Sequence, residues 1–230
     1  MECRGHRGES DADAATGVRI LVTAGPTREA IDPVRFLSNR SSGKMGYAIA
    51  EAAVASGHDV TLVSGPVCLH VPTGLTAFRP VVSAEDMYQA VESAIGDADA
   101  VIMAAAVADY RPATVAGQKI KKIGATLTLE LERTRDILGS ARGLMGFGGI
   151  LAGFAAETEN VRENALGKLK RKGCDVIFAN DVRFSDRGFD ADRNQITAYF
   201  ADGRELPLDN ATKSHLGARL IEIIESLSRP

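Results

Sequence analysis

Short apolar runs alternate with segments of helical character along most of the chain. The apolar runs are rich in β-branched residues, as buried strands are, and they cover residues 18–23, 59–64, 100–106, 149–154 and 175–179. Helical segments lie between them, at residues 45–56, 83–95, 136–144 and 161–172. This alternation predicts an α/β protein with a Rossmann-like, three-layer, mainly parallel sheet and helices on both faces.

The remaining segments are more polar. Residues 27–39 form a long connection after the first strand, and residues 126–131 alternate as a half-exposed strand does. Residues 195–200 and 204–206 predict a C-terminal β-hairpin. Asp209 or Asn210 is expected to cap a final helix, whose apolar stripe consists of Leu216, Leu220, Ile223, Ile224 and Leu227.

Two helix starts carry recognisable capping residues. The sequence Ser83-Ala-Glu-Asp86 resembles a capping box in which Asp replaces the usual Glu or Gln. Thr134 is the expected cap of the helix over residues 136–144. Both signals support the helical assignment of the segments that follow them.

Composition indicates one globular domain in a reducing compartment. The 230 residues are 45% hydrophobic and 25% charged, which predicts a single domain over residues 18–230 after a disordered tail or linker at 1–17. With a net charge of −3, the chain lacks the excess of positive charge that is typical of proteins that bind nucleic acid or an anionic membrane. Cys3, Cys68 and Cys174 lack the spacing of zinc sites or disulfide frameworks, so a cytoplasmic protein is expected.

Residues 38–46 read Ser-Asn-Arg-Ser-Ser-Gly-Lys-Met-Gly and immediately precede a predicted helix. Unpaired N–H groups and a partial positive charge at a helix N-terminus suit a phosphate group. The stretch is not a standard P-loop, because Ser38 stands in place of the first Gly and Met45 in place of the hydroxyl residue. A G-x-G-x-x-G fingerprint is also missing. The pattern leaves two interpretations open, a phosphate site and a tightly packed structural turn.

Two groups of lysines are further candidates. Lys119, Lys121 and Lys122 lie in a loop-like segment, where a solvated basic loop is the favoured interpretation. Lys168 and Lys172 are spaced i, i+4, which places both ammonium groups on one helix face. Ordinary surface lysines are the simpler explanation of this pair, and a cationic edge of a cleft is the alternative.

Six stretches together resemble one family, the bacterial phosphopantothenate-cysteine ligases, also called phosphopantothenoylcysteine synthetases. They are Thr23-Ala-Gly-Pro-Thr-Arg-Glu, the segment 38–46, Ala104-Ala-Ala-Val-Ala-Asp-Tyr, Lys119-Ile-Lys-Lys, Gly153-Phe-Ala-Ala-Glu-Thr and Ala179-Asn-Asp. The resemblance implies that CTP, 4'-phosphopantothenate and L-cysteine are joined through an acyl-cytidylate, with Mg2+ as cofactor. It also implies a homodimer, with the predicted hairpin as a plausible interface, and a decarboxylase domain or partner.

The resemblance assigns roles to individual residues. Asn39 matches the asparagine that holds the acyl intermediate, and Lys119 matches a flap lysine associated with acyl-cytidylate formation. Nucleotide-binding positions are matched by Ala105, Ala106, Asp109, Lys119, Phe154, Lys168 and Lys172. The turn Arg135-Asp136-Ile137-Leu138 matches another nucleotide contact, where the family carries Pro in place of Arg.

Gly43 and Gly46 are assigned to the triphosphate by the helix N-terminus argument. CTP is expected rather than ATP, and no metal ligands are predicted. A non-catalytic nucleotide-binding module on the same fold is the alternative function. A nicotinamide-dependent reductase is disfavoured by the missing glycine fingerprint.

Overall fold

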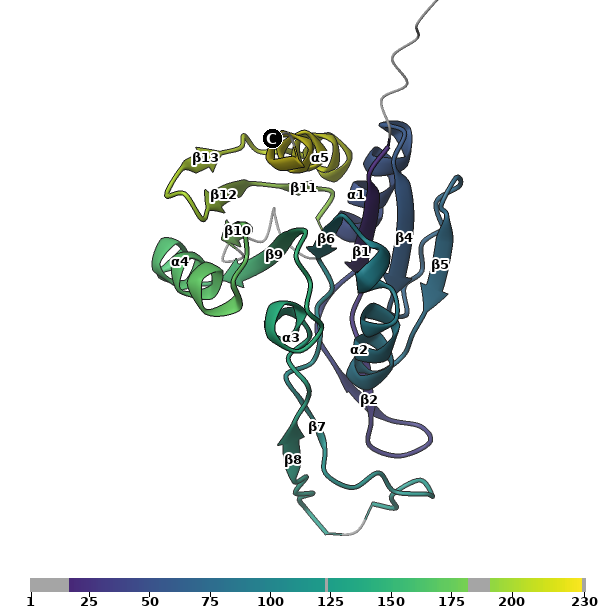
Figure 1. The fold of residues 1–230 in the computed structure, drawn as a ribbon. Helices are drawn as coiled ribbons and strands as arrows, with labels where there is room; N and C mark the ends of the chain where they lie inside the picture. The colour runs from purple at the N-terminus through teal and green to yellow at the C-terminus, as the bar shows by residue number, and fades with distance from the viewer. Residues whose placement is uncertain (1–16, 123, 182–190, 229–230) are drawn as a thin grey trace, which may run out of the picture.

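The computed structural model describes residues 17–122, 124–181 and 191–228. Its centre is an eight-stranded sheet in the order β13-β12-β10-β9-β6-β1-β4-β5 (Figure 1). The six parallel strands are β1 (Arg19–Ala24), β4 (Asp59–Ser64), β5 (Ala77–Pro80), β6 (Ala100–Met103), β9 (Ile150–Glu157) and β10 (Val176–Asp181). The hairpin of β12 (Ile196–Phe200) and β13 (Glu205–Pro207) adds antiparallel strands beside β10. The α/β, mainly parallel architecture is confirmed.

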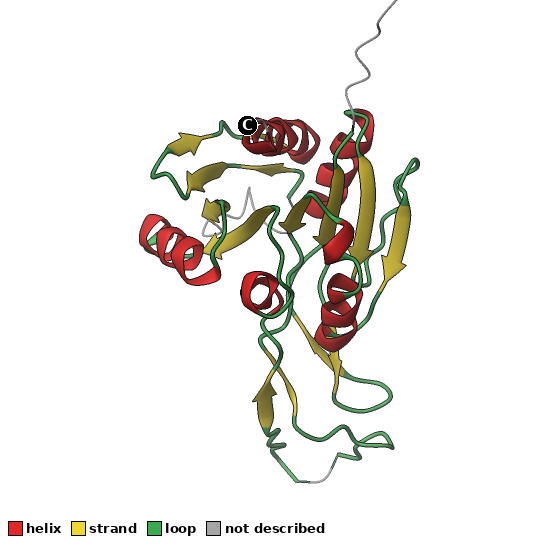
Figure 2. Ribbon diagram, viewed as in Figure 1, coloured by secondary structure: helices red, strands yellow, loops and turns green. Residues whose placement is uncertain are grey.

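Helices cover both faces of the sheet (Figure 2). One apolar cluster joins the strands to α1 (Lys44–Ala55) and α5 (Lys213–Ser228), and a second joins them to α2 (Ala84–Glu92), α3 (Ile137–Gly143) and α4 (Val161–Lys172). Ile20 and Val22 of β1 point into the first cluster and Leu21 into the second. Because each central strand is buried on both faces, its sequence is continuously apolar instead of alternating.

Helix ends differ from the prediction in three places. The capping box of Ser83 and Asp86 is present, but α2 ends at Glu92 and a 3-10 turn, η1 (Ile95–Asp97), follows. Asp136, not Thr134, caps α3 through the Gly139 N–H. At α5 the cap is Thr212, which accepts the His215 N–H, and not the predicted Asp209 or Asn210. Thr212 takes this position because it is the last residue of β14 (Ala211–Thr212), directly before the helix. β14 pairs with β11 (Arg193–Asn194).

Besides the β11–β14 pair, two more short antiparallel ribbons were not predicted. The connection over residues 27–39 contains β2 (Arg28–Ala30) and β3 (Phe36–Ser38), paired as a hairpin. The expected strand at 126–131 is wrong, since β8 (Leu131–Arg133) begins there and pairs with β7 (Tyr110–Pro112). Within the described part of the chain, residues 126–130 belong to no strand, although the Glu130 carbonyl accepts the Ala113 N–H next to the ribbon. We call β7, β8 and the loop between them the arm, which projects from the sheet in Figure 1.

The predicted tail, the question of a membrane span and the stripe on the last helix complete the comparison with the prediction. Of the tail at 1–17, only Gly17 is among the described residues. Residues 182–190, before β11, also lie outside them. Within the described ranges, no helix has both the length and the apolar character needed to cross a membrane. The predicted stripe on α5 is confirmed, because Leu216, Leu220, Ile223 and Ile224 are buried and Leu227 packs against them.

Candidate functional site

The candidate site is a two-lobed cleft beyond the carboxyl ends of β1, β6 and β9. Within the parallel sheet the chain proceeds outward from β1 in one direction and from β6 in the other. Crevices at such reversals are where ligands bind in open α/β sheets. The larger lobe has a volume of about 780 Å³ and the smaller one about 330 Å³. Their shared wall consists of Ala105, Val107, Asp109, Phe154 and Lys168.

The smaller lobe lies at the N-terminus of α1, as the motif predicted. Residues 41–46 line it together with Asn39 and Ala104–Val107, so Gly43, Gly46, Ala105 and Ala106 are all in its wall. Gly43 is the N-cap residue, with a left-handed φ of 76° that a side chain would strain. The N-terminal end of α1 therefore borders this lobe.

Gly46 also has a packing role. A Cβ atom added there would lie 2.5 Å from the Ala24 Cβ and 3.1 Å from the Thr23 carbonyl oxygen. The helix therefore approaches β1 so closely that only glycine fits. The two interpretations of the motif are thus compatible, because close packing brings the helix N-terminus to the cleft.

Asn39 is held at the mouth of the smaller lobe. Its Nδ2 donates to the carbonyl oxygen of Val107 at 2.9 Å and to that of Ala106 at 3.4 Å. These contacts fix the amide plane and use the donor side of the amide. The Oδ1 atom keeps its acceptor capacity for a ligand, since no described residue donates to it.

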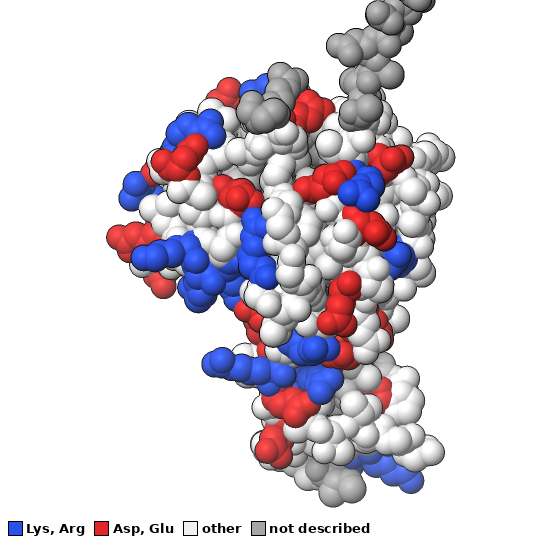
Figure 3. Space-filling view, in the orientation of Figure 1, with Lys and Arg blue, Asp and Glu red and all other residues white. Residues whose placement is uncertain are grey.

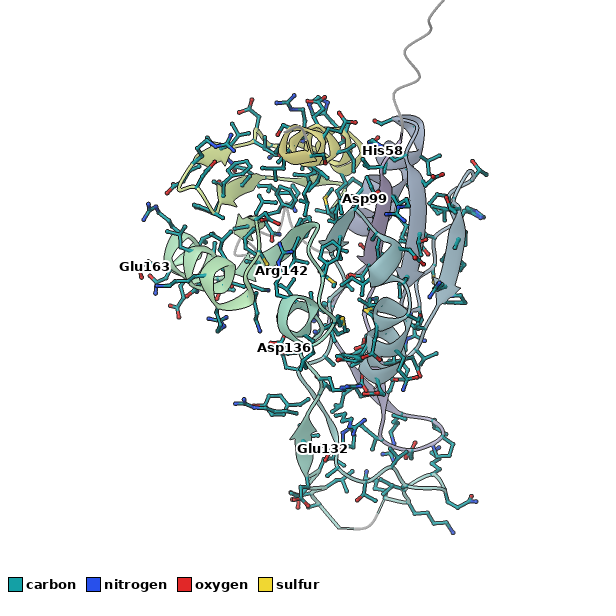
Figure 4. All side chains as sticks on the ribbon, in the orientation of Figure 1. His58, Asp99, Glu132, Asp136, Arg142 and Glu163 are labelled. Atoms are coloured by element: carbon teal, nitrogen blue, oxygen red, sulfur yellow. The ribbon has the colours of Figure 1, made fainter. Side chains whose placement is uncertain are left out.

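The turn before α3 forms a wall of the larger lobe, where Arg135, Asp136, Ile137 and Leu138 all line the cavity. Thr134 Oγ1 donates to the Ala108 carbonyl oxygen at 2.6 Å, which ties the turn to the β6–β7 connection. Asp136 forms an ion pair with Lys172 of α4 and lies at the N-terminal end of α3 (Figure 4). Burial opposes ionisation of Asp136, but hydrogen bonds from Lys172 and the Gly139 N–H outweigh it and hold its pKa below the usual value.

The two lysines of α4 are not ordinary surface lysines. Lys168 and Lys172 both line the larger lobe, and Lys168 also borders the smaller one. Lys168 Nζ donates to the Phe154 carbonyl oxygen at 2.6 Å, and burial lowers the pKa of Lys168. Figure 3 shows Lys and Arg side chains gathered over α4 and beside the arm. This edge of the cleft is suited to an anionic ligand.

Lys119 is not brought into either lobe. It is exposed on the loop of the arm, as are Lys121 and Lys122, which agrees with a solvated basic loop. The neighbouring Ile120 is anchored to the β2–β3 hairpin, because its N–H donates to Asp32 Oδ2 at 3.1 Å and its carbonyl accepts from Arg35 Nη2 at 2.9 Å. The Arg35 guanidinium holds the pKa of the buried Asp32 carboxyl far below its usual range.

Several wall residues were not among the predicted site residues. The smaller lobe also contains Asn180, Asn194 and Lys213, and the larger lobe Met87, Arg133 and Arg171. Asn180 was detectable, since it follows the apolar run 175–179 at a strand end. Lys213 was not, because only the packing of α5 beside α1 brings it to the cleft.

Comparison with known proteins places this geometry in a family. Residues 15–227 match the model described as "DNA/pantothenate metabolism flavoprotein C-terminal domain". The chain is 48% identical over 224 residues to the Coenzyme A biosynthesis bifunctional protein CoaBC of Bacillus subtilis, covering 97% of this chain and 55% of that protein. It is 46% identical over 211 residues to the Escherichia coli K12 protein of the same name, covering 90% and 51%. The chain thus spans about half the length of these relatives.

Solved structures agree. A crystal structure of the C-terminal domain of a CoaBC protein superposes with a TM-score of 0.78 at 46% identity, covering 92% of this chain and 96% of that one. The DNA/pantothenate metabolism flavoprotein from Streptococcus pneumoniae shares the fold, with a TM-score of 0.79 at 23% identity, covering 92% of this chain and all of that one. With a family match that extends over nearly the whole described sheet and cleft, this chain belongs to the family of DNA/pantothenate metabolism flavoprotein C-terminal domains.

Proposed function

We propose that this chain is a phosphopantothenate-cysteine ligase that uses CTP in coenzyme A biosynthesis. The observation that carries the proposal is the two-lobed cleft with a shared wall, since a reaction between a nucleotide and an acid needs two compartments that meet. The names of the B. subtilis and E. coli relatives place those proteins in coenzyme A biosynthesis, which supports the same pathway for this chain.

We assign the base and ribose to the larger lobe, which is lined by the turn at 135–138 and by Lys172. The reacting phosphorus and the acyl carbon then lie at the shared wall, between Lys168 and the N-terminus of α1. Asn39 borders this point from the smaller lobe, where its Oδ1 and the helix N–H groups supply complementary polar contacts. This arrangement brings the two substrates together in a fixed orientation, a major source of rate acceleration.

Two substitutions complete the reaction. In the first, a carboxylate oxygen of 4'-phosphopantothenate attacks the α-phosphorus of CTP, and the bond to the β-phosphate oxygen breaks to release pyrophosphate. In the second, the cysteine amine attacks the acyl carbon, the amide bond forms, and CMP leaves as a proton is lost from nitrogen. Lys168 and the N-terminus of α1 are positioned to stabilise negative charge that develops on the phosphate oxygens.

The residues present fit Mg2+ that arrives with the nucleotide. No group of three His, Cys, Asp or Glu side chains in the described part of the chain could enclose a metal ion. Mg2+ is commonly held by one or two carboxylates together with substrate phosphates, and the Asp109 carboxylate lies at the wall shared by both lobes. When bound, the ion supplies further neutralisation of phosphate charge.

The decisive experiment is pyrophosphate release by the purified protein with Mg2+, CTP and 4'-phosphopantothenate, with and without cysteine, repeated with ATP in place of CTP. We expect release that requires phosphopantothenate and turns over when cysteine is added. A folded protein that binds CTP without releasing pyrophosphate would instead be a nucleotide-binding module. Preference for ATP would overturn the nucleotide assignment alone.

The role of Lys119 is tested by Lys119→Gln. Because Lys119 is exposed and contributes nothing to the core, the variant is expected to keep wild-type stability while acyl-cytidylate formation falls at least about tenfold. Quenched-flow measurement of the intermediate reports this step, and Lys122→Gln in the same loop is the matched control. Wild-type intermediate formation in Lys119→Gln would remove Lys119 from the reaction.

A further inference from the structure

The turn at residues 133–136 is held from three sides. Thr134 ties it to the β6–β7 connection and Asp136 ties it to α4, as described above. Arg135 reaches in a third direction, toward α2, which lies on the same face of the sheet as α3. Its partners on α2, Glu85 and Tyr88, line neither lobe of the cleft.

The Arg135 guanidinium lies between an aromatic platform and a carboxylate. Its Cζ is 3.5 Å from the centroid of the Tyr88 ring, and its Nη1 donates to Glu85 Oε1 at 3.1 Å. Tyr88 is only 1% exposed, so the core fixes the platform. Glu85 is held in turn by Gln89 Nε2 at 3.1 Å, one helical turn further along α2.

We propose that Glu85 and Tyr88 are positioning residues for the nucleotide, and that they act through Arg135 on the turn that lines the larger lobe. The inference rests on the proposed function in taking the ligand of that lobe to be a nucleotide. Position 135 has no proline ring to restrict its backbone, so the side-chain contacts of Arg135 to α2 restrain the turn on this side.

The link is tested first without any ligand, by hydrogen exchange. The N–H groups of Thr134 and Gly139 donate to the Asp109 carbonyl and to Asp136 Oδ1, so they report whether the turn is held. Glu85→Gln and Arg135→Lys are expected to speed exchange over residues 133–140 several-fold. Glu92→Gln, an exposed change on the same helix, is the matched control and leaves exchange unchanged. Wild-type exchange in both test variants would overturn the proposal.

The second test measures nucleotide use. Glu85 lines neither lobe, yet Glu85→Gln is expected to raise the KM for CTP about two- to fivefold with little change in kcat, the size expected for weakening one partly exposed ion pair. In the Arg135→Met background the same change is expected to have no further effect. An unchanged KM, or an equal effect in both backgrounds, would contradict the proposal.

The two proposals can fail separately. If the wild-type protein neither binds CTP nor releases pyrophosphate, the proposed function fails. The hydrogen-exchange comparison still decides whether Glu85 holds the turn, because it needs no nucleotide.

Discussion

At the scale of single residues, the partly buried ammonium group of Lys168 is the most informative. Burial lowers its pKa because the charged form loses hydration. A phosphate group in the cleft would favour the charged form, so the pKa is expected to be higher in the complex than in the free protein.

This difference predicts a pH-dependent affinity. Lys168 is protonated in both states below its free-state pKa, whereas between the two pKa values binding must take up a proton. Affinity for CTP should therefore fall as pH rises through that window, by at most about tenfold per pH unit. Calorimetric titrations across alkaline pH measure this slope. Lys168→Met should bind more weakly and lose the slope, and a slope that persists in this variant would assign the proton to another group.

At the scale of elements, the contact between α1 and β1 depends on Gly46. In Gly46→Ala the new Cβ would overlap Ala24 and Thr23, at an expected cost of about 1–3 kcal/mol of unfolding free energy. Gly167 in α4 is the matched control, because a Cβ there meets nothing within 4 Å. Gly167→Ala should gain about 0.5–1 kcal/mol. Urea unfolding of both variants measures the difference, and equal stabilities would show that α1 can move away from β1.

The anchor between the β2–β3 hairpin and the arm makes a second prediction. Asp32 accepts hydrogen bonds from the N–H groups of Val34, Arg35 and Ile120 and from the Arg35 guanidinium. In Asp32→Asn, an amide NH2 group would replace one of the two carboxylate oxygens. Because an NH2 group cannot accept a hydrogen bond, some of these donors would lose their partner. Trypsin should therefore cut after Lys119, Lys121 and Lys122 several-fold faster in Asp32→Asn than in the wild type.

The control for this experiment is Asp99, a second carboxylate that accepts hydrogen bonds from a backbone N–H and an arginine guanidinium. Asp99 accepts from the Arg19 N–H and from its guanidinium, far from the arm in Figure 4. Asp99→Asn should leave cleavage in the arm unchanged. Equal cleavage rates in the wild type and Asp32→Asn would mean that other contacts, such as the Ala116 N–H to the Ile31 carbonyl, hold the loop.

The elements that could be predicted from sequence are those whose own pattern of apolar and polar residues shows which positions are buried. The central strands are apolar throughout because both faces are covered, and α4 was located with its observed ends. β5 was missed because Ala77-Phe-Arg-Pro80 is a half-exposed edge strand that contains proline. The arm was missed because its strands have three residues each and are stabilised by pairing with each other, which no local pattern reveals.

The same distinction applies to the site. The motif at 38–46 and the lysines of α4 lie next to predicted strand ends, so topology alone brings them together. The contact of Arg135 with Tyr88 and the position of Lys213 depend on how helices pack, and this cannot be obtained from spacing along the chain.

At the scale of the whole molecule, the two apolar clusters share their strands. Phe178 of β10 belongs to the cluster with α1 and α5, and its neighbour Ile177 belongs to the cluster with α2, α3 and α4. Losing either helical layer would expose one face of every central strand to water. We therefore expect the two layers to unfold in a single cooperative transition.

This expectation is testable with one reporter on each face. Tyr47 lies in the first cluster and Tyr88 in the second, so fluorotyrosine NMR can follow both during urea unfolding. Leu220→Ala and Met87→Ala remove fully buried side chains from opposite faces, and each should cost about 2–5 kcal/mol. Either change should shift the midpoints of both tyrosine signals together, because the strands transmit the loss to the other face. If Leu220→Ala shifted only the Tyr47 signal, the layers would be separate folding units, and the cleft between the strand ends could open without loss of the α2–α4 layer.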